Sequence, residues 1–143
     1  MTIAAILRGK GNGVVALPRD ASVREAVAML ADKRIGAVPV VDDGGAVVGI
    51  FSERDVVYCL AAHGPQALDR AVAEVMTQPV QSVTPDEPAI GALSLMTRRR
   101  IRHLPVVDGG RMVGFVSIGD LVKYRIDRIE ADAAAMRDYI QSA

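Results

Sequence analysis

Apolar residues in the first half of the chain follow two different periods, and each period indicates one kind of element. A three- and four-residue spacing predicts one buried helix face, formed by Val23, Ala26, Val27 and Leu30. Two short apolar runs follow at 37–41 and 47–51, and the DDGG between them favours a hairpin turn. A second helix is predicted to begin at Glu53, and residues 14–17 could add an edge strand. This half therefore reads helix, strand, strand, helix.

The same order of periods returns in the second half of the chain. RIGAVPVVDDGGAVVGIFSERDVV (34–57) aligns with RIRHLPVVDGGRMVGFVSIGDLV (100–122). Pro39 lies over Pro105, an offset of 66, and Gly49 lies over Gly114, an offset of 65, because the second turn is one residue shorter. A repeat of this length is a supersecondary unit, and neighbouring copies normally complete each other's core.

The helix starts of the two copies are predicted from capping residues. Ser22 and Glu25 form a capping box in the first copy. In the second copy we expect Asp86 as the N-cap and Pro88 in the first turn, ahead of an apolar face formed by Ala89, Ala92, Leu93 and Met96. The segment 63–79 also has helical spacing and resembles the opening TIAAILRGK, so we interpret it as a lead-in helix that belongs to the second repeat.

The chain ends in a long predicted helix. No Gly or Pro follows Asp120, and a heptad stripe runs along Val122, Ile126, Ile129, Ala133, Met136 and Ile140. We expect this stripe to pack on the first repeat or on the same helix of a second subunit, and we favour a homodimer. The predicted organisation is repeat 1 at 1–62, repeat 2 at 63–124 and a C-terminal helix extension at 125–143.

Composition narrows the class of protein. The 143 residues carry 17 Lys and Arg against 17 Asp and Glu, so the formal net charge is zero. A balanced chain lacks the overall positive charge expected of a nucleic-acid or anionic-membrane binder. No apolar segment is long enough to cross a bilayer, and the start shows no charged leader, so we expect a cytoplasmic α/β protein with neither a nucleic acid nor a membrane as partner.

The most informative motif occurs twice, as GIFSERD (49–55) and GFVSIGD (114–120), each ahead of an apolar run. One interpretation is structural, because Ser followed three residues later by an acidic residue is a capping box. The other is a ligand site, because a helix start offers free backbone N–H groups and a positive dipole end to an anion. Spacing alone leaves both interpretations open.

These motifs, together with IGAVPVVD and IRHLPVVD, strongly resemble the cystathionine β-synthase (CBS) domain, and the tandem copies resemble a Bateman module. The resemblance implies an α/β (α+β) fold of two βαββα-type repeats related by a pseudo-two-fold axis. It also implies two clefts for an adenosine-containing ligand such as AMP, ADP, ATP, NAD(H) or S-adenosylmethionine. In that pattern the Asp accepts hydrogen bonds from ribose hydroxyls and the Ser faces phosphate; charge-assisted bonds of this kind are the stronger ones.

The resemblance also assigns residues to the two clefts, each cleft combining the Ser and Asp of one repeat with lead-in residues of the other. Cleft A would contain Ser52, Arg54, Asp55, Thr84, Ile101, Arg102 and His103. Cleft B would contain Leu17, Pro18, Ile35, Gly36, Ala37, Ser117 and Asp120.

The two clefts differ in their polar groups. Pro18 stands where the other copy has Thr84, and it has neither a hydroxyl nor an N–H to donate. Gly119 stands where cleft A has Arg54. We therefore expect cleft A to be the better nucleotide site. Arg102 and His103 are candidate phosphate ligands, and Lys33 and Arg34 are their counterparts in repeat 1.

No arrangement of residues in the sequence indicates catalysis. The two His and the single Cys lack metal-ligand spacing, and no nucleophile is paired with a base in a known motif. GKGNG (9–13) does not fit the dinucleotide fingerprint and is interpreted as a loop. We therefore predict a regulatory or sensor module of the AMP, ATP or NAD(H) class that acts on an unidentified partner in trans, with no catalytic cofactor. The alternative is a ligand-free dimerisation and protein-interaction module.

Overall fold

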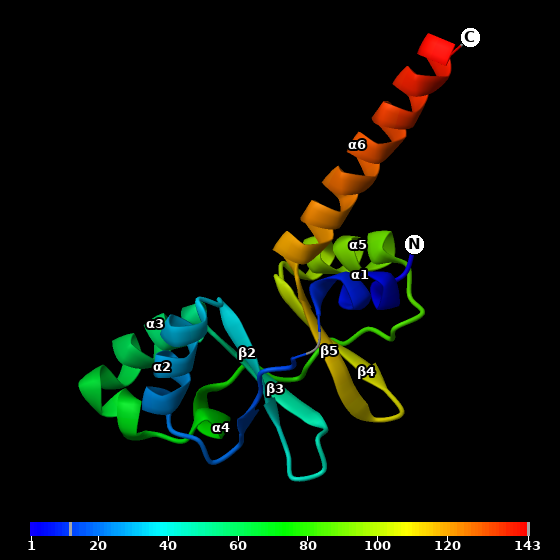
Figure 1. Ribbon diagram of the computed structural model, residues 1–143. Coiled ribbons are helices and arrows are strands. Elements are labelled where there is room, and N and C mark those ends of the chain that lie inside the picture. The colour runs from blue at the N-terminus through cyan, green and yellow to red at the C-terminus, as the bar shows by residue number, and fades with distance from the viewer. Residues whose placement is uncertain (12, 143) are drawn as a thin grey trace.

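The computed structural model describes residues 1–11 and 13–142, which form two α/β lobes and one long projecting helix (Figure 1). The first lobe contains β1 (Leu17–Pro18), α2 (Val23–Lys33), β2 (Ala37–Val41), β3 (Val47–Ser52) and α3 (Glu53–His63). The second contains α5 (Ala89–Arg99), β4 (His103–Asp108), β5 (Arg111–Ser117) and α6 (Ile118–Ser142). The helix, strand, strand, helix order is thereby confirmed in both halves.

The two lobes repeat the same strand pairing. β2 and β3 form an antiparallel hairpin, as do β4 and β5, and each hairpin shifts register at the equivalent point. Leu17 of β1 pairs in parallel with Val40, and Val83 pairs in parallel with Val106 at the same offset of 66. The edge strand predicted near residues 14–17 is present only from Leu17 onward, as β1, and in the second lobe its counterpart is a single bridge at Val83.

Two of the predicted helix starts behave differently. The capping box of α2 is present, because the Glu25 N–H donates to Ser22 Oγ and the Ser22 N–H donates to the Glu25 carboxylate. The prediction for α5 is wrong, because its N-cap is Pro88 and the carboxylate of Asp86 accepts a bond from the Thr84 hydroxyl instead. The N–H of Ala89, the first residue of α5, donates to the carbonyl of Met1 at 2.9 Å, far away in the sequence.

The lead-in segments pack on the opposite lobes. α1 (Ile3–Lys10) places Ile3 and Ile6 in the core of the second lobe. Segment 63–79, the linker between the lobes, places Ala67 and Val72 in the core of the first lobe. Each lobe thus completes its core with a segment of the other predicted repeat, since α1 of repeat 1 packs on the second lobe and the linker of repeat 2 packs on the first.

The linker does not form the single helix expected from its apolar spacing. It is divided into a 3-10 helix η1 (Gly64–Asp69) and a short helix α4 (Val72–Val75). Between them, Arg70 and Ala71 are extended, because Ala71 pairs with Ser22 and Val72 N–H donates to the Ala21 carbonyl at 2.7 Å. Pairing with the first lobe replaces the helical hydrogen bonds at this point.

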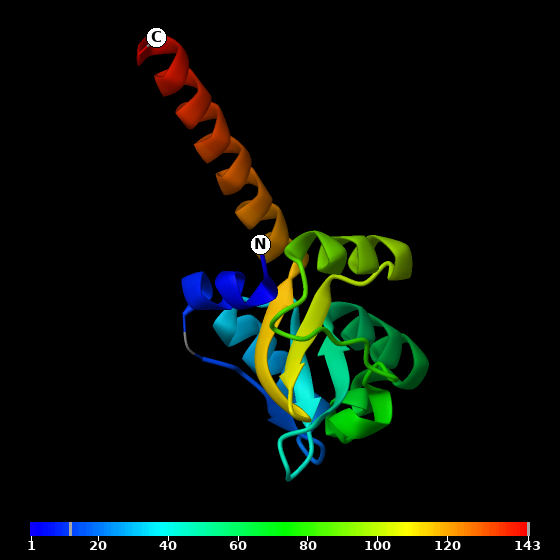
Figure 2. The same ribbon diagram turned by 90° about the vertical axis from the view of Figure 1, so that its right-hand side faces the viewer.

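α6 confirms the predicted long C-terminal helix and begins at Ile118, directly after β5. Leu121 is buried in the second lobe and Tyr124 is half-buried against it. From there the helix projects away from both lobes, as Figures 1 and 2 show. The predicted packing of its apolar stripe on repeat 1 is wrong, because the stripe residues are exposed.

Candidate ligand cleft

A strand-to-helix turn builds the site in the second lobe. β5 ends at Ser117 and α6 begins at the next residue, so the backbone N–H groups of the first turn have no helical partner. Ser117 N–H donates to Asp120 Oδ2 at 2.8 Å, and Asp120 N–H donates to Ser117 Oγ at 3.1 Å. The capping interpretation of this motif is therefore correct, and it fixes the position of the carboxylate.

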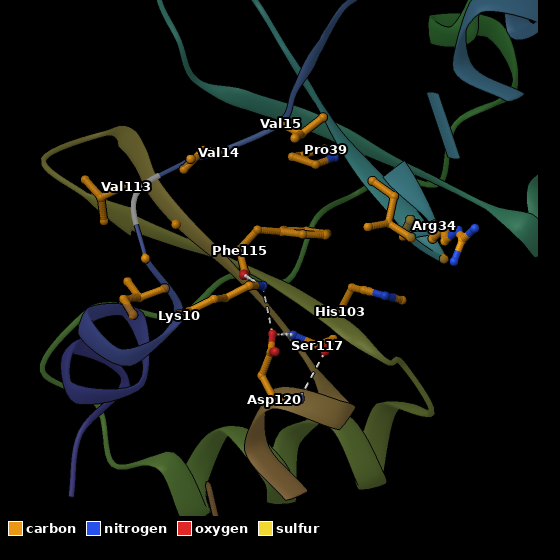
Figure 3. A pocket seen from close by; sticks show the side chains of 17 residues that line it. Lys10, Val14, Val15, Arg34, Pro39, His103, Val113, Phe115, Ser117 and Asp120 are labelled. Atoms are coloured by element: carbon orange, nitrogen blue, oxygen red, sulfur yellow. Dashed lines mark hydrogen bonds and ion pairs between the residues drawn. The ribbon is translucent and has the colours of Figure 1, made fainter. Parts of the chain in front are cut away.

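Lys10, the last residue of α1, reaches the same carboxylate from the other end of the chain. Its Nζ lies 2.8 Å from Asp120 Oδ2 and also donates to the carbonyl of Phe115 at 2.7 Å (Figure 3). The Ser117 N–H and the Lys10 ammonium therefore both donate to the same carboxylate oxygen, Asp120 Oδ2. Within residues 1–11 and 13–142, no hydrogen bond reaches Asp120 Oδ1. That oxygen is available to a ligand.

These contacts keep Asp120 ionised. Partial burial opposes the charged form, but the hydrogen bonds from Lys10 and Ser117 and the charge of Lys10 outweigh it, so the pKa of Asp120 is lowered from 3.8. The side chain keeps 27% of its exposure, so solvent and small molecules can reach it. Asp120 thus offers a partly accessible negative charge at neutral pH.

A cavity of about 640 Å³ opens in front of this carboxylate (Figure 3). Segments from both lobes form its walls. The first lobe supplies Val14, Val15, Arg34, Ile35, Gly36, Ala37 and Pro39, and the second supplies His103, Val113, Gly114, Phe115, Ser117 and Asp120. α1 and the residue after it complete the wall with Leu7, Lys10 and Gly11, and Gly13 follows. A space of this size holds a small organic molecule.

Two aromatic rings lie side by side along this wall. His103 and Phe115 stack with 5.6 Å between ring centroids and 11° between planes. Burial and then the charge of Lys10 lower the pKa of His103 from 6.5, although Asp120 and Glu53 act in the opposite direction. The imidazole is therefore neutral at pH 7 and presents a flat, uncharged ring to the cavity.

The equivalent turn in the first lobe is arranged differently. Ser52 caps α3 through Asp55 N–H, and Ser52 N–H donates to Asp55 Oδ2 at 2.9 Å. Thr77 Oγ1 also donates to Asp55 Oδ1 at 2.8 Å, and only 9% of Asp55 remains exposed. Both carboxylate oxygens of Asp55 are thus occupied within the chain.

Backbone pairing holds Thr77 over this carboxylate. Thr77 exchanges two hydrogen bonds with Ile50 of β3, at 2.8 and 3.0 Å. The neighbouring Met76 lies directly over Gly49, where a Cβ would come within 2.3 Å of its sulfur. The linker therefore covers the first turn in the same way that α1 covers the second, where Leu7 lies over Gly114.

The residues assigned to cleft A do not share one environment. Arg54 and Arg102 are exposed, Ile101 packs against the core of the second lobe, and Thr84 donates its hydroxyl to Asp86. His103, which the resemblance assigned to cleft A, lines the cavity together with Ser117 and Asp120. At the first position of β4 it lies beside Gly36, where a Cβ would be 3.6 Å from His103 Cε1.

Most residues assigned to cleft B do line the cavity, namely Ile35, Gly36, Ala37, Ser117 and Asp120. Leu17 and Pro18 are not among its lining residues. Leu17 is buried in the core of the first lobe and Pro18 is exposed. Val14 and Val15 lie in the wall instead, because the chain passes the cavity before it reaches β1.

Lys10 is the functional candidate that the sequence interpretation missed. It lies in the Gly-rich stretch 9–13, which we interpreted as a loop; Lys10 in fact ends α1, and Asn12 lies outside the described residues. A cation between glycines was the available signal. Its partner Asp120 is 110 residues away, so sequence spacing could not connect them.

Within residues 1–11 and 13–142, no group of three or more His, Cys, Asp or Glu side chains could hold a metal ion. In the same residues, no helix combines the length and apolar character that a membrane span requires.

Comparison with known proteins identifies the repeated unit. The family model described as the CBS domain matches residues 12–62 and 72–127, once in each half of the chain. The chain belongs to the CBS-domain family. The CBS-domain containing protein ATU1752 from Agrobacterium tumefaciens is similar in structure, with a TM-score of 0.82 and 40% identity over 87% of this chain and 92% of that one.

Two further solved CBS structures carry named ligands. The CBS domain pair of protein MJ0100 was solved in complex with 5'-methylthioadenosine and S-adenosyl-L-methionine; its TM-score is 0.79 at 27% identity, over 90% of this chain and 98% of that one. The CBS domain protein PAE2072 from Pyrobaculum aerophilum was solved in complex with AMP; its TM-score is 0.75 at 29% identity, over 84% and 89%.

Among curated relatives, the mitochondrial CBS domain-containing protein CBSX3 from Arabidopsis thaliana is 32% identical over 98% of this chain and 72% of its own length. An enzyme among the relatives is covered to a smaller extent. Inosine-5'-monophosphate dehydrogenase from Mycobacterium bovis is 40% identical over 73% of this chain, but this covers 19% of the enzyme. This CBS chain therefore matches a limited part of that enzyme.

Proposed function

We propose that this tandem CBS protein is a regulatory module that binds an adenine nucleotide in the cleft B cavity and acts on a partner protein in trans. The observation that carries the proposal is the Asp120 carboxylate, ionised, partly exposed and facing a cavity of about 640 Å³ between the lobes. Adenosine-containing ligands in the solved relatives MJ0100 and PAE2072 support the ligand class.

The cavity offers a suitable partner for each part of a nucleotide. Asp120 Oδ1 can accept a bond from a ribose hydroxyl while Oδ2 stays bonded to the Ser117 N–H. Lys10 and Arg34 supply two positive charges for phosphate. Pro39 and the stacked Phe115 supply apolar surface for a base. The ligand that fits this set best is AMP or another nucleotide with a phosphate.

The charge of the cavity distinguishes this ligand from S-adenosylmethionine. Lys10 and Arg34 outnumber the single carboxylate Asp120 among its lining residues. A phosphate gains from this balance, whereas the positively charged sulfonium of S-adenosylmethionine is repelled by it. We therefore infer that this chain binds AMP, ATP or NAD(H) more tightly than S-adenosylmethionine.

The proposal also includes a homodimeric state and a cytoplasmic location. The exposed apolar stripe of α6 supports a homodimer. It equally supports the alternative function, a ligand-free module that dimerises and binds a protein. The cytoplasmic location stays a prediction from the sequence.

Titration of the purified protein with AMP tests the proposal, by calorimetry and by thermal shift, with S-adenosylmethionine in parallel. A ligand that binds the folded state stabilises it by RT ln(1 + [L]/Kd), so the melting temperature rises with the logarithm of the ligand concentration above Kd. We expect Asp120→Asn to weaken AMP binding about tenfold, since a charge-assisted bond is replaced by a neutral one.

Asp55→Asn is the matched control, because it makes the same change at the covered turn. We expect it to leave AMP affinity within about twofold of the wild type. The reverse result, with loss in Asp55→Asn alone, would place the site in cleft A, as the sequence comparison of Thr84 and Pro18 predicted. No binding of any adenosine ligand would favour the ligand-free alternative.

A further inference from the structure

The apolar stripe of α6 has no partner in the described chain. Its side chains remain between 41% and 65% exposed at Val122, Ile126, Ile129, Met136 and Ile140. Ala133, between them, is also exposed. The stripe runs for almost three heptads along the part of the helix that projects from the lobes (Figure 1). Exposing a continuous row of apolar side chains to water is unfavourable in free energy, and such a row usually marks a surface that packs against a partner.

The face that contacts the second lobe is a different one. Leu121 is buried there and Tyr124 is half-buried against the same core. Successive residues turn by 100°, so Leu121 lies about 100° from Val122, and Tyr124 lies about 160° from both Val122 and Ile126. The lobe therefore leaves the stripe accessible along its whole length.

We propose that α6 pairs with α6 of a second copy as a parallel, in-register coiled coil, with the lobes of both copies at its N-terminal end. The proposal deepens the homodimer part of the proposed function and rests on it. The stripe spacing of four and three residues places Ile126, Ala133 and Ile140 at a positions and Val122, Ile129 and Met136 at d positions.

The charges beside the stripe favour the parallel orientation. In a parallel pair, each g residue faces the e residue five positions later on the other helix. Arg125 would then face Glu130 of the second copy, and Asp132 would face Arg137 of the second copy. Two-fold symmetry doubles both pairs, so four attractive pairs flank the seam. Asp132 is 72% exposed, so its contact with Arg128 of its own helix leaves it accessible.

The antiparallel orientation places like charges together. Aligning the same apolar layers in opposite directions centres the pair near residue 131, which brings e residues to e residues and g to g. Glu130 would then face Glu130 of the second copy, Asp132 would face Asp132, and Lys123 would face Arg137. The sequence thus disfavours the antiparallel pair and supports the parallel one.

Disulfide cross-linking tests the orientation. The natural Cys59 is buried, so a Cys introduced on α6 is the reactive one. In Ile140→Cys, a parallel pair brings the two introduced thiols within disulfide reach, whereas an antiparallel pair places them at opposite ends of the seam. We expect mild oxidation to give a disulfide-linked dimer on a non-reducing gel. Asp138→Cys, on the outer face of the helix, is the matched control and should stay unlinked.

Charge reversal tests the register by sedimentation. Arg137→Glu should raise the dimer dissociation constant about tenfold, because two attractive pairs become repulsive. Asp132→Arg combined with Arg137→Glu should restore most of the affinity, because the pairs reform with exchanged signs. A dimer that sediments normally but gives no Ile140→Cys disulfide would overturn the parallel pairing and leave the homodimer intact. A monomer would overturn both, and AMP affinity in the same samples reports separately on the ligand site.

Discussion

The two strand-to-helix turns carry the same capping box and nevertheless leave their carboxylates in different states. Asp55 is bonded at both oxygens and almost fully buried, because Thr77 donates to it. Asp120 keeps one oxygen accessible, because Lys10 and Ser117 share the other. The difference arises from the segments that cover the turns, since α1 and the linker contribute different side chains. Among the described residues, the repeated motif therefore has both carboxylate oxygens hydrogen-bonded in one copy and only one of them in the other.

The largest expected effect compares the two carboxylates in folding. Asp55→Ala removes the carboxylate that accepts the Ser52 N–H and the Thr77 hydroxyl, so we expect a loss of about 2–3 kcal/mol in unfolding free energy. Asp120→Ala removes the acceptor of the Ser117 N–H and a partly exposed ion pair with Lys10, so we expect a loss of about 1 kcal/mol. Urea unfolding of both variants measures the difference. Equal losses of unfolding free energy in the two variants would show that the hydrogen bond from Thr77 to Asp55 does not stabilise the fold.

An intermediate effect concerns the glycines under the two covers. A Cβ at Gly114 would lie 2.6 Å from Leu7, and one at Gly49 would lie 2.3 Å from Met76. We expect Gly114→Ala and Gly49→Ala each to cost about 1–2 kcal/mol in urea unfolding, because a well-packed neighbour must move.

Only one of these glycine variants should change the ligand site. Gly114→Ala pushes on α1, which carries Lys10, so AMP affinity measured by calorimetry should fall. Gly49→Ala pushes on the linker and should leave AMP affinity unchanged. A fall in affinity in both variants would contradict the separation between the two turns.

The smallest expected effect is a pH dependence confined to the second site. His103 occupies the position that Ala37 holds in the first repeat. Burial and the Lys10 charge lower its pKa in the folded state, so below pH 6.5 the unfolded chain takes up this proton first. Stability is therefore retained above pH 6.5 and is lost as the pH falls through the lowered pKa.

The matched variant His103→Ala should show a shallower loss of stability between pH 6.5 and 5, measured by thermal unfolding across that range. An identical pH profile in the wild type and the variant would contradict this assignment. Comparing the wild type with His103→Ala between pH 6.5 and 5 separates the effect of His103 from that of the carboxylates, which titrate mainly at lower pH.

Much of the fold could be predicted because its signals are local. The apolar face of α2, the two hairpins and the capping boxes at Ser22 and Ser52 depend on residues a few positions apart. The N-cap of α5 could not be predicted, because the Met1 carbonyl supplies the partner for Ala89 N–H across 88 residues. The same reason explains the linker, where pairing of Ala71 with Ser22 interrupts the helical spacing.

The sequence by itself determined the repeated unit, the two Ser and Asp pairs and the long terminal helix, because periodicity and capping depend on neighbours along the chain. Only the tertiary structure decided which carboxylate is covered. Thr77 reaches Asp55 across 22 residues and Lys10 reaches Asp120 across 110. Such contacts follow from how α1 and the linker pack on opposite lobes, and this exchange leaves no periodic signal in the sequence.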